Sequence, residues 1–330
     1  MSDSLKDRIL NLSRGDKQGF NQLALEVFRY QATNNVVYNE YISHLSVDST
    51  KVSSIEEIPF LPISFFKRHR ISTLNSTPER IFTSSGTTGS VTSRHELYGT
   101  KWYEAITTKI WNEYYPSLEN CVILALLPGY LEREGSSLIY MVDHFIKSSG
   151  DARNGFFLYD HDKLYHLLQS LKGEGKTVVL FGVTFGLLDF AESYSLSFPE
   201  LIIMETGGMK GRRKEMTRQE VHTIIKKSFG VERVHSEYGM TELLSQAYSN
   251  GNGIFAPSST LDIILRDTND PFSYVPERKT GGVNVIDLAN VDTCSFIETQ
   301  DLGRKYDDGT FEVLGRFDNS DIRGCNLMVL

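Results

Sequence analysis

The stretch Asn120-Cys-Val-Ile-Leu-Ala-Leu-Leu127 decides the fold class, because it is a short, almost uninterrupted apolar run. Such a run is typical of a strand covered on both faces of a sheet, whereas a strand with one wet face alternates. Similar runs follow at 176–181 and 201–204, and helical stretches are predicted after them and at 136–147. Alternating strands and helices predict a parallel α/β sheet, with ligands at the carboxyl ends of its strands.

The flanking sequence changes character on both sides of this region. Residues from about Ser4 to Leu45 have apolar side chains at helical spacing, so the N-terminal part, 1–57, is predicted to be helical. A further helix begins with the capping box Thr217-Arg-Gln-Glu220 and ends at Gly230. From about Gly253 onward, short strand-like runs replace the helical pattern. We therefore predict an α/β core at 1–250 and a terminal β subdomain at 251–330.

Composition limits the classes of partner. The chain has 330 residues and a net charge of −8, which argues against broad binding to nucleic acid or to anionic membranes. It shows no apolar run of about 20 residues, the length of a membrane span, and no signal peptide. Cys121, Cys294 and Cys325 are too few and too scattered for a disulfide framework. These features predict a cytoplasmic protein without membrane insertion.

A hydroxyl-rich loop, Phe82-Thr-Ser-Ser-Gly-Thr-Thr-Gly-Ser90, is the strongest chemical signal. Glycines free the backbone to point successive N–H groups inward, and Ser and Thr add hydroxyl donors, so such a loop can wrap phosphate. The Walker pattern is absent, because no Gly-Lys-Ser/Thr follows at the required offset. The residues predicted to bind phosphate are Ser84, Ser85, Gly86, Thr87, Thr88 and Gly89.

Weaker signals follow at strand ends and turns. Gly207 and Gly208 come after a buried strand and would let a flat ligand approach the backbone, although a tight turn explains them equally well. Tyr238-Gly239-Met-Thr241-Glu242 combines a hydroxyl with a carboxylate at a turn, and an ordinary helix start is the alternative. Asp301 could accept ribose hydroxyls or be a solvated turn residue. Gly-Arg316-Phe-Asp318 lies near the end of the chain.

The order of these motifs resembles the adenylate-forming superfamily, which contains acyl-CoA synthetases, luciferases and peptide-synthetase adenylation domains. Within it, the chain is most similar to acyl-protein synthetases of the LuxE type, which supply fatty acids in bacterial bioluminescence. The closer likeness covers roughly 58–330 and rests on Ile58-Pro-Phe-Leu-Pro62, Leu127-Pro-Gly-Tyr-Leu-Glu-Arg133, Gly135-Ser-Ser-Leu138, Glu205-Thr-Gly-Gly-Met-Lys-Gly211, Ile286-Asp-Leu-Ala-Asn290 and Arg323-Gly-Cys325.

The resemblance implies an AMP-forming ligase. A long-chain fatty acid would react with ATP in the presence of Mg²⁺ to give acyl-adenylate and pyrophosphate. The hydroxyl-rich loop would hold the β- and γ-phosphates, Gly207 and Gly208 the adenine plane, and Tyr238, beside Gly239, would flank the base. Thr241 would bind the α-phosphate and Glu242 would bind Mg²⁺, both as catalytic residues. Asp301 and Arg316 would hold the ribose.

Two departures from the superfamily pattern bear on mechanism. The phosphate loop commonly carries a Lys soon after its last glycine, and here Arg94 stands near that place. The chain stops at Leu330, so the resemblance also implies that the mobile C-terminal domain, with its adenylation lysine, is absent. In LuxE-type proteins a cysteine near the carboxyl terminus accepts the acyl group as a thioester. This implies that Cys325 is a catalytic nucleophile, although an isolated Cys is more often a small buried apolar residue.

The sequence is compatible with three functions. The first is acyl transfer through Cys325 to a partner protein, an acyl reductase or an acyl-carrier protein. The second is an acyl- or aryl-CoA ligase, or an enzyme that acylates a carrier protein. The third, of a different class, is a non-catalytic protein that binds an acyl group or a nucleotide.

Overall fold

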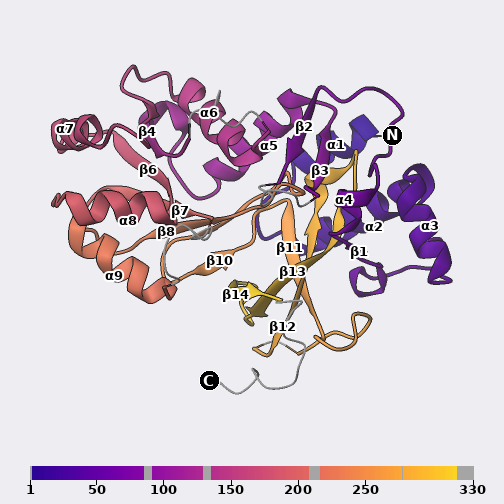
Figure 1. The fold of residues 1–330 in the computed structure, drawn as a ribbon. Helices are drawn as coiled ribbons and strands as arrows, with labels where there is room; N and C mark the ends of the chain where they lie inside the picture. The colour runs from indigo at the N-terminus through magenta and orange to yellow at the C-terminus, as the bar shows by residue number, and fades with distance from the viewer. Residues whose placement is uncertain (1, 85–90, 129–134, 208–215, 277, 318–330) are drawn as a thin grey trace.

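The computed structural model describes residues 2–84, 91–128, 135–207, 216–276 and 278–317. Within these ranges, no helix is long and apolar enough to cross a membrane. Helices occupy the N-terminal part and flank the middle of the chain (Figure 1). The helices are α1 (Ser2–Leu10), α2 (Lys17–Asn34), α3 (Val36–His44), α4 (Phe65–Arg68), α5 (Thr100–Asn112), α6 (Ser137–Ser149), α7 (His161–Leu171), α8 (Thr184–Ser193) and α9 (Arg218–Phe229).

Most strands of the described residues join one twelve-stranded sheet, in the order β11-β12-β13-β14-β10-β9-β8-β7-β6-β4-β5, with β1 paired to β13. A separate hairpin pairs β2 with β3. The strands are β1 (Leu61–Pro62), β2 (Arg80–Thr83), β3 (Arg94–Leu97), β4 (Cys121–Leu126), β5 (Gly155–Phe156), β6 (Thr177–Val183), β7 (Ile202–Thr206), β8 (His235–Tyr238), β9 (Ala247–Ser249), β10 (Ile254–Ala256), β11 (Leu261–Arg266), β12 (Thr280–Asp287), β13 (Phe296–Lys305) and β14 (Phe311–Arg316).

The strands β5, β4, β6, β7 and β8 form the parallel half of the sheet. All six residues of β4 are buried, as its continuous apolar sequence predicts. Its alternate side chains Val122 and Leu124 belong to a core that includes residues of α7, α8 and α9. Ile123 and Ala125 belong to a core with residues of α5 and α6. The parallel half is therefore covered by helices on both faces, and the predicted α/β architecture is confirmed.

The strands β9 to β14 make the antiparallel half, which also confirms the predicted terminal β region. The sheet is continuous from one half to the other, because β9 pairs with β8 and β10 pairs with β14. One uninterrupted hydrogen-bonded sheet thus contains residues from both sides of position 250. The domain boundary near residue 250 stays a prediction. The N-terminal helices pack on the antiparallel half, where the rings of Phe28 and Tyr38 contact Phe296.

Local sequence signals explain several element boundaries. The predicted capping box at the start of α9 is present, with Thr217 and Glu220 bonded to each other's backbone N–H. Gly230 ends that helix at φ 69°, a left-handed conformation that favours glycine. The hydroxyl-rich loop lies between β2 and β3, whose last pair joins Thr83 to Arg94. Phe82, Thr83 and Ser84 of this loop are described, and residues 85–90 are not.

Candidate functional site

A cavity of about 600 Å³ opens where the parallel strands end. Its floor is formed by residues at the carboxyl ends of β6, β7 and β8, the edge where open α/β sheets bind ligands. The β2–β3 hairpin, the start of α6 and the strands β13 and β14 supply the walls. The residues that line the cavity include Lys67, Ser84, Ser93, Tyr103, Met141, Phe185, Thr206, Gly207, Glu237, Gly239, Thr241, Glu242, Gln246, Asp301 and Arg316.

The cavity brings together most of the predicted site residues that the structure describes. They come from elements far apart in the chain, so the fold and not sequence proximity makes the site. Ser85, Gly86, Thr87, Thr88, Gly89, Gly208 and Cys325 lie outside the described residues. The predicted residues that line the cavity are Ser84, Gly207, Gly239, Thr241, Glu242, Asp301 and Arg316.

Tyr238 is placed differently from the other members of its motif. In β8, successive side chains point to opposite faces, and Glu237 and Gly239 line the cavity while Tyr238 is buried. Its ring packs on Phe255 and Phe311, with centroid separations of 5.8 Å and 5.7 Å. Its hydroxyl donates to Asp301 Oδ2 at 2.9 Å. Tyr238 therefore reaches the site through Asp301, and its role beside the adenine base stays a prediction.

Asp301 joins two strands at the rim of the cavity. It faces Arg316 across the β13–β14 ladder, and Arg316 Nε donates to Asp301 Oδ1 at 3.2 Å. The carboxyl group is buried, whereas the Arg316 side chain is 75% exposed, so their ion pair is screened by water. Both carboxylate oxygens are oriented by a donor and retain free lone pairs. Such a carboxylate can still accept two neighbouring hydroxyl groups.

Glu242 is the buried carboxyl group at the other end of the motif. Burial raises the pKa of Glu242, while a hydrogen bond from Ser93 and the charges of Arg316 and Lys67 lower it. Mg²⁺ prefers oxygen ligands and keeps several of them from water or substrate. Among the described residues, no group of three or more His, Cys, Asp or Glu side chains forms a metal site. Glu242 therefore offers the cavity one carboxylate of the kind that Mg²⁺ binds.

Lys67 is a site residue that the sequence reasoning missed. It lies in the short helix α4, just after the apolar residues 58–66, and it lines the cavity. Its positive charge lowers the pKa of Glu242. Arg94, which the sequence suggests as the phosphate-loop cation, is exposed and is not among the lining residues. The segment 58–67 carries two prolines, and nothing in its sequence indicated where Lys67 would point.

Two buried side chains hold the backbone beneath Thr241 and Glu242. The Nδ1 atom of His95 bonds the carbonyl oxygen of Thr241 at 2.8 Å, so this nitrogen carries the proton. Its Nε2 atom lies 3.1 Å from the Thr293 hydroxyl, which fits a neutral ring that accepts there. Asn290 Nδ2 donates to the carbonyl oxygen of Glu242 at 2.8 Å. These contacts fix the motif's backbone from below and leave its side chains directed toward the cavity.

Asp287 fixes the residues that follow. Its fully buried carboxylate accepts hydrogen bonds from the backbone N–H of Leu244 at 2.7 Å and of Ser245 at 3.0 Å. It also accepts from the Ser245 hydroxyl at 2.6 Å and from the Ala289 N–H at 3.0 Å. Three of these four donors belong to the loop after Glu242, so the carboxylate attaches that loop to the end of β12. The motif Ile286–Asn290, noted from sequence, therefore supports the site from behind.

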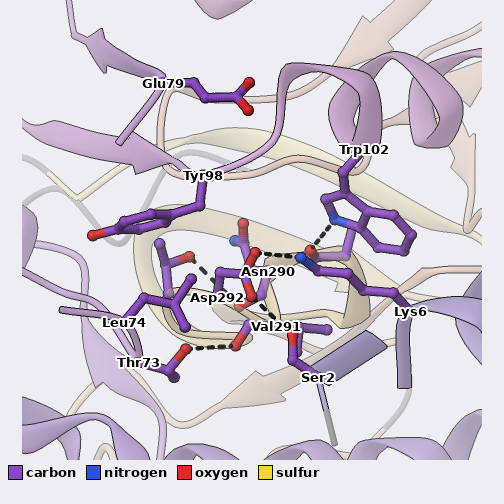
Figure 2. Close-up of polar contacts among 12 residues, drawn as sticks. Ser2, Lys6, Thr73, Leu74, Glu79, Tyr98, Trp102, Asn290, Val291 and Asp292 are labelled. Carbon is purple, nitrogen blue, oxygen red and sulfur yellow. Dashed lines mark hydrogen bonds and ion pairs between the residues drawn. The ribbon is translucent and has the colours of Figure 1, made fainter. Parts of the chain in front are cut away.

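Helices α1 and α5 contact residues 289–292, which follow β12, from outside (Figure 2). Lys6 Nζ lies 2.5 Å from Asp292 Oδ2, and the Ser2 hydroxyl donates to Asp292 Oδ1 at 3.1 Å. Trp102 Nε1 donates to the carbonyl oxygen of Ala289 at 2.9 Å. Helices α1 and α5 thus contact residues 289–292, the segment that supports Glu242 through Asn290.

Comparison with known proteins identifies the fold. No protein-family model matches the chain, and no curated protein sequence matches it. ATP-bound MatB from Rhodopseudomonas palustris matches with a TM-score of 0.53 and 17% identity, over 73% of this chain and 49% of that one. An open conformation of 2-hydroxyisobutyryl-CoA ligase in complex with 2-HIB-AMP and CoA matches with a TM-score of 0.67 and 12% identity, over 93% and 77%.

The same ligase in the postadenylation state with R3-HIB-AMP gives a TM-score of 0.68 at 11% identity, over 93% of this chain and 69% of that one. The chain spans about half the length of MatB. These likenesses show that the chain has the fold of adenylate-forming enzymes, as the order of its motifs predicts.

The burial of His95 predicts a specific loss of stability in acid. Burial lowers the pKa of His95 to about 4, whereas an unfolded histidine titrates near 6.5. Between these values the unfolded chain binds a proton that the folded chain excludes, so the free energy of unfolding falls as the pH falls. We expect the wild type to lose ~2 kcal/mol more than His95→Gln between pH 7 and pH 5. Urea unfolding at both pH values measures this, and equal losses in the two proteins would contradict it.

Proposed function

We propose that this protein is an AMP-forming ligase that activates a carboxylic acid with ATP. One observation carries the proposal: a single cavity collects Gly207, Thr241, Glu242 and Asp301 from separate elements, with Lys67 beside them. The chemistry of these residues suits the three parts of ATP, which are a flat base, a ribose and charged phosphates. The solved structures that share the fold carry ATP or an acyl-AMP in their names, which supports the same interpretation.

The nucleotide would lie along the rim from β7 to β13. Gly207, at φ 71° and without a side chain, would lie against the adenine plane. Asp301, held by Tyr238 and Arg316, would accept the two ribose hydroxyls. Thr241 would donate to the α-phosphate at a backbone position fixed by His95. Mg²⁺, when bound, would neutralise negative charge that develops on the leaving pyrophosphate.

Adenylation requires the protein to position the carboxylate of the substrate against the α-phosphate of ATP. A carboxylate oxygen of the substrate attacks the α-phosphorus, the bond from that phosphorus to the bridging oxygen breaks, and pyrophosphate leaves. Lys67 would place a positive charge near the phosphates, beside Glu242. Ser84 and the rest of the hydroxyl-rich loop would donate to the β- and γ-phosphates. Positioning and electrostatic stabilisation of this kind account for most of the catalysis in phosphoryl-type transfer.

The finer proposal concerns the acyl group and its acceptor. The cavity walls include Tyr103, Met141 and Phe185, which suit an apolar acyl group such as that of a fatty acid. The resemblance to LuxE-type proteins supports Cys325 as the acceptor, and this residue lies outside the described part of the chain. Its thiolate would attack the carbonyl carbon of the adenylate and release AMP. The resulting thioester would then pass its acyl group to a partner protein.

Adenylation predicts ATP–pyrophosphate exchange that depends on an added carboxylic acid. We expect Glu242→Gln to reduce the exchange rate by about 10²-fold or more, because an amide lacks the negative charge with which the carboxylate would hold Mg²⁺ at the phosphates. Lys67→Met should reduce it as well. Glu119→Gln, an exposed glutamate outside the cavity, is the matched control and should exchange at the wild-type rate. An absence of exchange with every acid tried, or full exchange by Glu242→Gln, would contradict the proposed function.

Transfer to Cys325 predicts a covalent adduct. Wild-type protein incubated with ATP and radiolabelled fatty acid should become labelled, and hydroxylamine should release the label because thioesters are labile to it. Cys325→Ser should retain pyrophosphate exchange and lose the hydroxylamine-labile label. Equal labelling of wild type and variant would contradict the acceptor role. Coenzyme A thioester formed without protein labelling would instead support a CoA ligase.

A further inference from the structure

Glu237 is an acidic side chain in the cavity that the proposed mechanism does not use. It lies in β8 and pairs in register with Thr206 of β7. The Thr206 hydroxyl donates to Glu237 Oε2 at 2.6 Å, and Oε1 has no hydrogen-bond partner among the described residues. Burial raises the pKa of Glu237 to about 7, and the bond from Thr206 opposes this shift. The surface that Glu237 still exposes faces the cavity.

The surroundings of Glu237 differ from those of Glu242. Lys67 and Arg316 both lower the pKa of Glu242, whereas within the described ranges neither a lysine nor an arginine contributes to that of Glu237. Burial raises the pKa of Tyr103, which lines the cavity from α5, and the charge of Glu237 adds to this shift. Two carboxyl groups in one cavity thus have separate environments, a feature that assigns them separate roles. Glu242 belongs to the phosphate end and Glu237 to the end with aromatic walls.

Further unpaired polar groups lie near Glu237. The side-chain oxygen of Gln246 is buried without a hydrogen-bond partner, while its nitrogen donates to the carbonyl oxygen of Leu244 at 2.9 Å. Tyr248 pairs in register with Glu237, and its buried hydroxyl also lacks a partner. Gly239 makes room for this arrangement, because a Cβ atom there would lie 2.4 Å from Glu237 Oε1. The unpaired oxygens of Gln246 and Tyr248 are enclosed by protein, so Glu237 Oε1 is the acceptor of this group that an occupant of the cavity can reach.

An occupant with only hydrocarbon at this position would be costly. It would remove the remaining water from Glu237 and supply no hydrogen bond in return, which is costly for a buried acceptor. An occupant with an O–H or N–H group would donate to Glu237 Oε1. Sites built to hydrogen-bond a substrate hydroxyl discriminate strongly against analogues that lack it. Glu237 thus favours a hydrogen-bond donor within an otherwise apolar ligand.

We infer that the carboxylic acid activated by this protein carries a hydroxyl or amino group on its carbon skeleton, which Glu237 binds. The inference rests on the proposed function and narrows its substrate class, because a plain long-chain fatty acid would leave Glu237 unpaired. Glu237 is then a specificity-determining residue that contacts the substrate away from its reacting carboxylate. The shared chemistry is a hydrogen-bond donor, and the experiment separates the two sources, hydroxyl and amine.

The test compares matched acids in the pyrophosphate-exchange assay. Each set contains an unsubstituted acid and its hydroxy and amino derivatives of the same carbon number, with the substituent moved along the chain. For at least one derivative we expect kcat/KM at least tenfold above that of its unsubstituted parent in the wild type. Glu237→Leu should abolish or reverse that preference. Glu237→Gln, whose amide oxygen still accepts, should retain a preference for the hydroxy acid but lose one for the amine.

Several outcomes would overturn the inference while leaving the proposed function intact. One is that the wild type uses the unsubstituted acids as well as every derivative. Another is that Glu237→Leu exchanges normally with an unchanged preference. A third is that Glu237→Leu raises KM for ATP but not for inosine triphosphate, which lacks the 6-amino group, because Glu237 would then bind adenine. No exchange with any acid would instead contradict the proposed function itself. The wild-type comparison needs no variant, so poor folding of Glu237→Leu cannot obscure it.

Discussion

The site depends on the buried carboxylate of Asp287. This side chain is fully enclosed, and four donors from Leu244, Ser245 and Ala289 surround it. A carboxylate in a protein interior is tolerated only when its oxygens are well satisfied, because an unpaired buried charge costs several kcal/mol. The loop after Glu242 must therefore remain bonded to the end of β12. These bonds hold the loop after Glu242 against the antiparallel half of the sheet.

The neighbouring turn extends this constraint to the rest of the chain. Asn290 bonds the backbone of Glu242, and Thr293 bonds the ring of His95, which in turn holds Thr241. Lys6 contacts Asp292 from the N-terminal helix. Segments separated by nearly the whole sequence thus converge behind two residues that face the cavity. Rigid support of this kind is what a preorganised site for charged phosphates requires.

The parts of the fold that sequence predicted are those set by local patterns. The continuous apolar run at β4 indicates burial on both faces, and the capping box at Thr217 indicates a helix start. Neither signal depends on contacts with distant parts of the chain. The joining of both halves into one sheet was not predictable, because β9 and β10 are three residues each and carry too little pattern. Non-local pairing alone aligns them with β8 and β14.

The same distinction applies to the site. Gly207, Thr241, Glu242, Asp301 and Arg316 were predicted because their motifs occur in a recognisable order, and the cavity brings them together. Their motif order does not reveal side-chain direction. The alternation of β8 turns Tyr238 into the core and Glu237 toward the cavity, and only the register of the strand decides which of the two faces a ligand. Lys67 was missed for a related reason, since a helix of four residues has no periodicity to read.

The central claim is that the cavity at the strand ends binds ATP with its ribose at Asp301 and its α-phosphate at Thr241. A crystal structure of the protein with Mg²⁺ and a non-hydrolysable ATP analogue tests this most directly. We predict adenine density against Gly207, both ribose hydroxyls within hydrogen-bond distance of Asp301, and the metal ion bound at Glu242. A nucleotide bound elsewhere, or a cavity that stays empty at saturating nucleotide, would contradict the account.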